Sequence, residues 1–150
     1  MSTDTFTFTR NLPLSAERMW ILLTAPECRE IWGAPDDNLV LETISSDFSI
    51  GGVDHHRCGP ADQPEFEVKT RWYNIDAPAA ATFTETIIAG GMALGASLVT
   101  YALSPATKGC DLVITVAVAS FVGSEMMDEF KAGWPGGMAK LDRIVAQEIG

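Results

Sequence analysis

One carboxylate stands where a strand pattern directs it into an apolar layer. Residues 82–88 read TFTETII, and Glu85 alternates in register with Phe83 and Ile87. Side chains two residues apart on a strand share a face, so Glu85 is expected on the apolar face, where an unpaired carboxylate is costly. Three interpretations stay open: Glu85 pairs with an arginine such as Arg71, it faces a cavity as a polar anchor or as an acid or base, or this face is exposed near the sheet edge. The structural interpretations are favoured, because ion pairs perturb carboxylates as readily as active sites do.

Both histidines of the chain lie side by side in the segment DHHRC, residues 54–58. Neighbouring side chains of a strand point to opposite faces, so His55 and His56 cannot bind one metal ion together. His56 and Cys58 share a face, but a zinc site takes at least three protein ligands and the sequence has no other histidine. The sequence therefore predicts no metal site.

Six aromatic side chains could line a ligand pocket, because such pockets are mostly apolar with a few polar groups. A core of this size also needs large aromatic residues, so packing explains each of them equally well. The six are Trp32, Trp72, Phe83, Tyr101, Phe130 and Trp134, and together with Glu85 they form the predicted ligand-binding set of seven residues.

The segment 131–145, KAGWPGGMAKLDRIV, carries an apolar stripe at helical spacing that keeps its phase through Pro135. A proline inside a helix costs about 3 kcal/mol and each glycine about 1 kcal/mol. We expect one long helix with a kink, or a short break followed by a continuation in line. Gly133 and Gly137 lie one turn apart, and the bare strip that they form makes room either for a ligand or for a closely approaching backbone.

The composition excludes several classes of function. The net charge is -10 and no cluster of Lys or Arg occurs, which argues against nucleic acid and anionic membranes as partners. The N-terminal residues do not resemble a signal peptide and no apolar stretch approaches about 20 residues, so we expect a cytoplasmic protein.

The three cysteines are widely separated and odd in number, which favours reduced thiols. Motifs for nucleotide binding, dinucleotide binding and serine hydrolysis are absent from the sequence, so no cofactor is predicted.

A sheet and one long helix are needed to hold these residues. The 150 residues suit a single domain, 1–150. An alternating strand near the N-terminus precedes two short helices divided at Pro26, about six further strands, and a helix from Ser124 to the end. About seven antiparallel strands need a cover over their apolar face, and only the last helix is long enough. We expect an α+β fold in which a curved antiparallel sheet wraps around the C-terminal helix.

Four stretches occur in an order that is typical of one known superfamily: RNLPLSAERMWILLTAPECREIW, DFSIGG, TRWYNIDAPAAATFTE and GWPGGMAKLDRIV. In these stretches the chain resembles the START-like helix-grip superfamily (SRPBCC), and within it the branch named for the activator of the heat-shock protein 90 ATPase. The resemblance spans nearly the whole chain. It implies a deep, often apolar cavity between the sheet and the long helix. It implies no single chemistry, because carriers, hormone receptors, polyketide cyclases and co-chaperone domains share this fold.

The leading hypothesis is a protein that binds a small, largely hydrophobic molecule between sheet and C-terminal helix, without a defined catalytic set. Two alternatives stay open. The first is an enzyme resembling a polyketide cyclase or a hydrolase that uses Glu85 as acid or base. The second is a protein-interaction module resembling the co-chaperone domain, with a chaperone as its partner. A homodimer formed through an exposed sheet edge or face also stays open.

Overall fold

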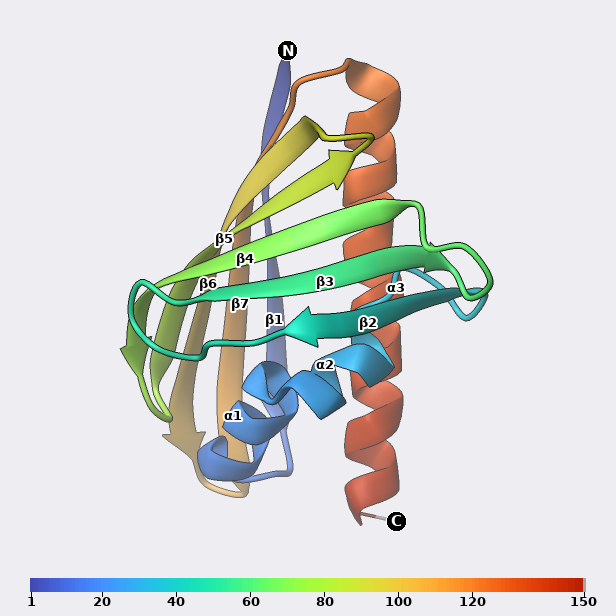
Figure 1. Ribbon diagram of the computed structural model, residues 1–150. Coiled ribbons are helices and arrows are strands. Elements are labelled where there is room, and N and C mark those ends of the chain that lie inside the picture. The colour runs from blue at the N-terminus through green and yellow to red at the C-terminus, as the bar shows by residue number, and fades with distance from the viewer. Residues whose placement is uncertain (150) are drawn as a thin grey trace.

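The computed structural model describes residues 1–149, and within them it contains seven strands and three helices (Figure 1). The strands are β1 (Ser2–Leu12), β2 (Leu39–Ser45), β3 (Val53–Pro60), β4 (Phe66–Asp76), β5 (Ala80–Ala89), β6 (Met92–Ala106) and β7 (Gly109–Ser120). The helices are α1 (Ala16–Thr24), α2 (Pro26–Trp32) and α3 (Ser124–Ile149). This order of elements confirms the predicted α+β fold.

All seven strands belong to one antiparallel sheet in the order β1-β7-β6-β5-β4-β3-β2. From β2 to β7 each strand pairs with the next one in the chain, and β1 then closes the other end against β7. The sheet curls around α3, with β2, β3 and β4 crossing on one side of the helix (Figure 1). This arrangement is a helix-grip fold.

Local signals account for the two short helices. Ser15 caps α1, and its hydroxyl oxygen accepts a hydrogen bond from the backbone N–H of Arg18 at 3.1 Å. Pro26 opens α2 at the first helical position, where its missing N–H would have no partner in any case. The predicted division of this region at Pro26 is therefore confirmed.

α3 continues through Pro135 without a break. A Cβ atom on Gly136 would overlap the carbonyl oxygen of Pro35, and one on Gly137 would lie 3.0 Å from the carbonyl oxygen of Trp32. Gly137 of the bare strip thus accommodates the backbone at the end of α2, and the adjacent Gly136 accommodates the backbone that follows it. For Gly137 the structure supports close approach of backbone, whereas a Cβ atom on Gly133 would meet the side chain of Pro35 at 3.6 Å.

In the part of the chain that the structure describes, the core consists of two hydrophobic clusters. The larger lies among the three helices, β1 and β4–β7, and its buried α3 members are Met127, Met138, Leu141 and Val145. The smaller lies at the β2–β4 end; its buried members are Ala34, Leu41, Cys58 and Val68, and its half-buried members are Leu39, Phe66 and Ile87. Within residues 1–149, no helix combines the length and the apolar character needed to cross a bilayer.

Candidate functional site

A band of polar side chains crosses the inner face of the sheet, on β3, β4 and β5. Glu85 of β5 is directly opposite Thr70 of β4, and Thr70 is directly opposite Asp54 of β3. Glu85 and Thr70 lie two residues from Phe83 and Trp72, and they share the inner face with these aromatic residues because side chains alternate along a strand. We call Asp54, Thr70 and Glu85, together with Arg29 of α2, the polar band.

Arg29 reaches the polar band from α2. Its Nη2 atom donates a hydrogen bond to Oε2 of Glu85 at 3.2 Å, and the side chains of the two residues are only 5% and 17% exposed. The guanidinium carbon lies 5.4 Å from the centre of the Phe83 ring, within the range of a cation–π contact. An arginine does pair with Glu85, but it is not Arg71, which is exposed and follows the inward Thr70 on β4, so that it lies on the outer face.

Asp54 lies at the other end of the polar band, and its carboxylate is fully engaged. Oδ2 accepts a hydrogen bond from Nε1 of Trp72 at 3.1 Å. Oδ1 accepts from Oγ of Ser46 at 2.9 Å and from the backbone N–H of Asp47 at 2.8 Å. These bonds tie the connection between β2 and β3 to the inner face, and they are the contacts that a buried carboxylate requires.

Several buried polar atoms in and beside the band make no hydrogen bond with any residue that the structure describes. The atoms are Nε and Nη1 of Arg29, the hydroxyl oxygens of Tyr101 and Thr70, and Nδ1 of His56. A buried polar group without a partner costs about 1–3 kcal/mol, and more when it is charged. A group that offers hydrogen-bond acceptors at this position would therefore be held firmly.

The protonation states of the groups in and beside the band follow largely from burial. Burial lowers the pKa of His56 to about 4, and the positive charge of Arg29 acts in the same direction. Burial raises the pKa of Tyr101 to about 12. Burial also lowers the pKa of Arg29, but the nearby Tyr101, Glu85 and Asp54 outweigh this effect, and the net shift of that pKa is upward. Near neutral pH the imidazole and the phenol are thus uncharged and the guanidinium is charged.

The predicted aromatic residues divide into two groups. Trp72, Phe83 and Tyr101 have no exposed surface, and Trp32 is 3% exposed. The ring of Phe83 lies 4.8 Å from that of Trp72 and 5.1 Å from that of Tyr101, measured between ring centres. These residues form a closed aromatic wall beside the polar band. Their part in ligand binding stays a prediction.

Phe130 and Trp134 of α3 are half-buried and pack against the larger cluster. The Trp134 ring stacks on Phe8 of β1 at 6.2 Å and lies 6.5 Å from Trp32. Of the predicted set, Glu85, Phe130 and Trp134 keep accessible surface.

The sequence analysis missed Arg29, Thr70 and Asp54. Arg29 lies three residues before Trp32 in α2, a spacing that places both side chains on one side of a helix. An inward position of Trp32 therefore predicts that Arg29 faces inward as well. Thr70 likewise follows from the inward position of Trp72 two residues later.

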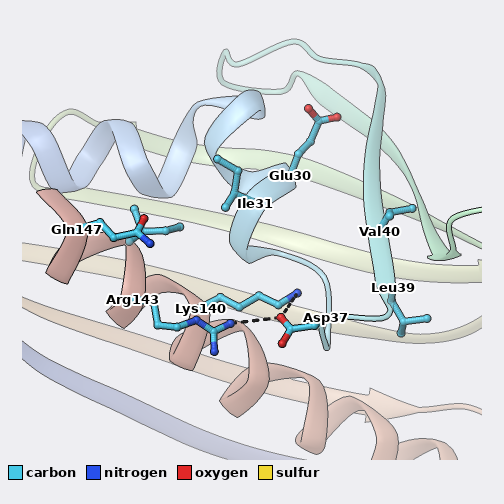
Figure 2. Close-up of a pocket in the computed structure, with 9 residues that line it drawn as sticks. Glu30, Ile31, Asp37, Leu39, Val40, Lys140, Arg143 and Gln147 are labelled. Atoms are coloured by element: carbon cyan, nitrogen blue, oxygen red, sulfur yellow. Dashed lines mark hydrogen bonds and ion pairs between the residues drawn. The ribbon is translucent and has the colours of Figure 1, made fainter.

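A surface cleft of about 360 Å³ lies between α2, β2 and α3 (Figure 2). Lys140 and Arg143 of α3 line it, and both are directed at Asp37, at nitrogen–oxygen distances of 4.0 Å and 3.3 Å. Lys140 also donates hydrogen bonds to the carbonyl oxygens of Ala34 and Asp36. Leu39 lines the same cleft and packs against the smaller hydrophobic cluster.

The two histidines lie on opposite faces, as the strand pattern predicts. His56 is 1% exposed, whereas Nε2 of His55 lies 3.8 Å from Oε1 of Glu67 on the neighbouring strand. Within residues 1–149, no group of three or more His, Cys, Asp or Glu side chains is arranged to hold a metal ion.

Solved structures with the same fold provide the comparison for this arrangement. Protein CV1439 from Chromobacterium violaceum is 19% identical, with a TM-score of 0.80 over 94% of this chain and 96% of that one. The Mll3558 protein from Rhizobium loti is 26% identical, with a TM-score of 0.79 over 93% and 95% of the two chains. No protein-family model matches the chain. No curated protein matches it either. The structural likeness covers the whole fold, and neither name states an activity.

Proposed function

We propose that this protein binds a small, largely hydrophobic molecule between the inner face of the sheet and α3. One observation carries the proposal: Arg29 is buried beside an aromatic wall, and its Nε and Nη1 atoms have no partner among the described residues. Ligand sites are typically apolar with a few polar groups that fix orientation. The polar band supplies those groups.

An ion pair built only for stability does not explain this arrangement. Buried ion pairs are at best weakly stabilising, because removing both charges from water offsets their attraction. Here only one of the guanidinium nitrogens is used by Glu85, and Tyr101 and Thr70 add two hydroxyls without partners. Such a surplus of unsatisfied groups is expected where a ligand completes the hydrogen bonding.

In this proposal the apolar part of the ligand lies beside the band. Ile87 is the next inward residue after Glu85 on β5, and it is half-buried together with Phe66 and Leu39 of the smaller cluster. Phe130 and Trp134 contribute half-buried apolar surface from α3. In this proposal the ligand lays its apolar body on these side chains and directs its polar end at Arg29.

In this proposal Glu85 acts as the counter-ion of Arg29 rather than as an acid or base. Its Oε2 atom already accepts a hydrogen bond from the guanidinium, which leaves the carboxylate committed to holding a buried cation. The guanidinium is the group left with unused donors. Binding is therefore favoured over the enzymatic alternative.

Titration with Nile red, an uncharged dye that fluoresces in apolar surroundings, tests the proposal. The double variant Arg29→Gln/Glu85→Gln removes one positive and one negative charge, so the net charge is unchanged. We expect saturable one-to-one binding by the wild type and at least roughly tenfold weaker binding by the double variant, because hydrogen bonds from a charged donor are lost. The variant Arg71→Gln, on the outer face of β4, is the matched control and should bind like the wild type.

Native mass spectrometry of freshly purified protein is the second measurement. A co-purified molecule of a few hundred daltons, present on the wild type and on the Arg71→Gln control but absent from the double variant, supports the proposal. Equal dye binding by all three proteins, or no saturable binding by the wild type, contradicts it.

A further inference from the structure

The charges of the polar band do not cancel. Arg29 brings one positive charge, and the carboxylates of Glu85 and Asp54 bring two negative charges. His56 and Tyr101 are uncharged near pH 7, because burial lowers the pKa of the first to about 4 and raises that of the second to about 12. The buried region already holds an excess of one negative charge.

Hydrogen-bond donors dominate among its unpartnered atoms. Nε and Nη1 of Arg29 can only donate, whereas the hydroxyls of Tyr101 and Thr70 and Nδ1 of His56 can each donate or accept. No atom of this unpartnered set is restricted to accepting, and both oxygens of Asp54 and Oε2 of Glu85 already accept hydrogen bonds. The group that satisfies this region is therefore an acceptor.

We infer that the ligand is electrically neutral and presents a carbonyl oxygen, as in a ketone, ester or amide, to the free donors of Arg29 and Tyr101. This inference rests on the proposed function and specifies its ligand class. A carbonyl oxygen accepts hydrogen bonds through its lone pairs without bringing a charge. It thereby accepts hydrogen bonds from the unpartnered donors and leaves the net charge of the region unchanged.

Charged ligands suit the band less well. A carboxylate would bring a third negative charge into a buried, poorly solvated space that already has an excess of one. A cationic ligand would face the guanidinium of Arg29 and would leave its free donors without an acceptor. Neither class of ligand satisfies the charge balance and the donor surplus together.

Three naphthalene derivatives of similar size separate these cases: 2-acetylnaphthalene, a neutral ketone; 2-naphthoate, an anion; and 2-ethylnaphthalene, which has no acceptor. Their affinities for the full chain are measured at pH 7.5 by calorimetric titration and by quenching of tryptophan fluorescence. We expect the ketone to bind at least roughly tenfold more tightly than each of the other two, the difference that a hydrogen bond from a charged donor typically makes.

The double variant Arg29→Gln/Glu85→Gln assigns that preference to the band. We expect it to lose roughly tenfold in affinity for the ketone while its affinity for 2-ethylnaphthalene changes less than about twofold. The Arg71→Gln control should keep the order of the wild type. The comparison of the three compounds on the wild type is informative even if the double variant fails to fold.

The outcomes separate the inference from the function on which it rests. Naphthoate binding as tightly as the ketone, or ethylnaphthalene binding as tightly as the ketone, overturns the inference and leaves a binding protein with another ligand class. Failure of all three compounds to bind up to their solubility limits, together with no dye binding, overturns the proposed function as well.

Discussion

Replacing Glu85 with glutamine measures how strongly Arg29 depends on its buried counter-ion. Glutamine keeps the size of the side chain and an acceptor oxygen, and it removes only the charge. At the observed 3.2 Å, two unit charges attract each other by about 5 kcal/mol if the effective dielectric constant is about 20. Breaking a buried pair by removing one partner typically costs about 3–5 kcal/mol.

The structure places the expected loss at the lower end of that range. The Glu85 side chain retains 17% of its exposure, so water already screens part of the interaction. Asp54 supplies a second negative charge that stabilises the Arg29 cation after the substitution. We therefore expect Glu85→Gln to lower the free energy of unfolding by about 3 kcal/mol.

Urea denaturation followed by tryptophan fluorescence is the assay. With a slope of about 1–3 kcal/mol per molar urea, the midpoint should fall by at least about 1 M. Thermal unfolding should show a loss of about 6–12 °C for a chain of this size. Glu42→Gln, an exposed glutamate of β2, is the matched control and should stay within about 0.5 kcal/mol of the wild type.

A second variant tests the cause of the loss. Removing both charges in Arg29→Met/Glu85→Leu should recover most of the stability, because no buried charge is then left without its partner. If Glu85→Gln is as stable as the Glu42→Gln control, or if the double variant is no more stable than the single one, the buried cation does not depend on Glu85 and the reasoning is refuted.

Three further predictions concern other parts of the same core. Gly136→Ala should lower the melting temperature, because its Cβ would overlap the carbonyl oxygen of Pro35, whereas Gly133→Ala should raise stability by about 1 kcal/mol, since its Cβ would lie 3.6 Å from the Pro35 side chain and alanine favours a helix. Calorimetric shifts of the same sign for the two variants would contradict this account. Folding lowers the pKa of His56 from 6.5 to about 4, so in that pH window the folded state binds fewer protons than the unfolded state, and stability should fall as the pH drops. His56→Gln should lose less stability than the wild type between pH 7 and pH 5 in urea titrations, and equal losses would refute the assignment. Burial raises the pKa of Cys58 to about 11, so iodoacetamide should modify this thiol at pH 8 only in urea, as mass spectrometry of peptides can verify; rapid modification of the folded protein would contradict its burial.

Local chemistry made most of the fold predictable. Ser15 and Pro26 mark helix starts, and both act at the positions where a cap or a proline is favourable. Gly90 and Gly91 both adopt positive φ, which is why they separate β5 from β6 in the chain. These signals act between residues that are close together in the chain, so the residue types alone predict the helix starts and the turn.

The partner of Glu85 could not be predicted in the same way. Its identity depends on the register of three strands and on the placement of α2 over them, and a bulge between Trp72 and Asn74 shifts that register. The alternation of residue types predicted that Glu85 points inward, but it could not name Arg29, which comes 56 residues earlier in the chain. Long-range pairing of this kind is decided by the assembled sheet.

The poor helix formers of α3 and the buried cation of α2 belong to one arrangement. The backbone from Trp32, the last residue of α2, to Pro35 lies against Gly136 and Gly137. A larger residue at Gly136 would fit there only if this backbone moved. Lys140, one turn further along α3, donates to the carbonyl oxygens of Ala34 and Asp36 and fixes the same segment. Because α2 is held so closely at its C-terminal end, Arg29, three residues before that end, is kept over the ring of Phe83 and against Glu85. The stability that the glycines remove from α3 is offset by the close packing that they permit, and this packing holds the guanidinium that α2 contributes to the polar band.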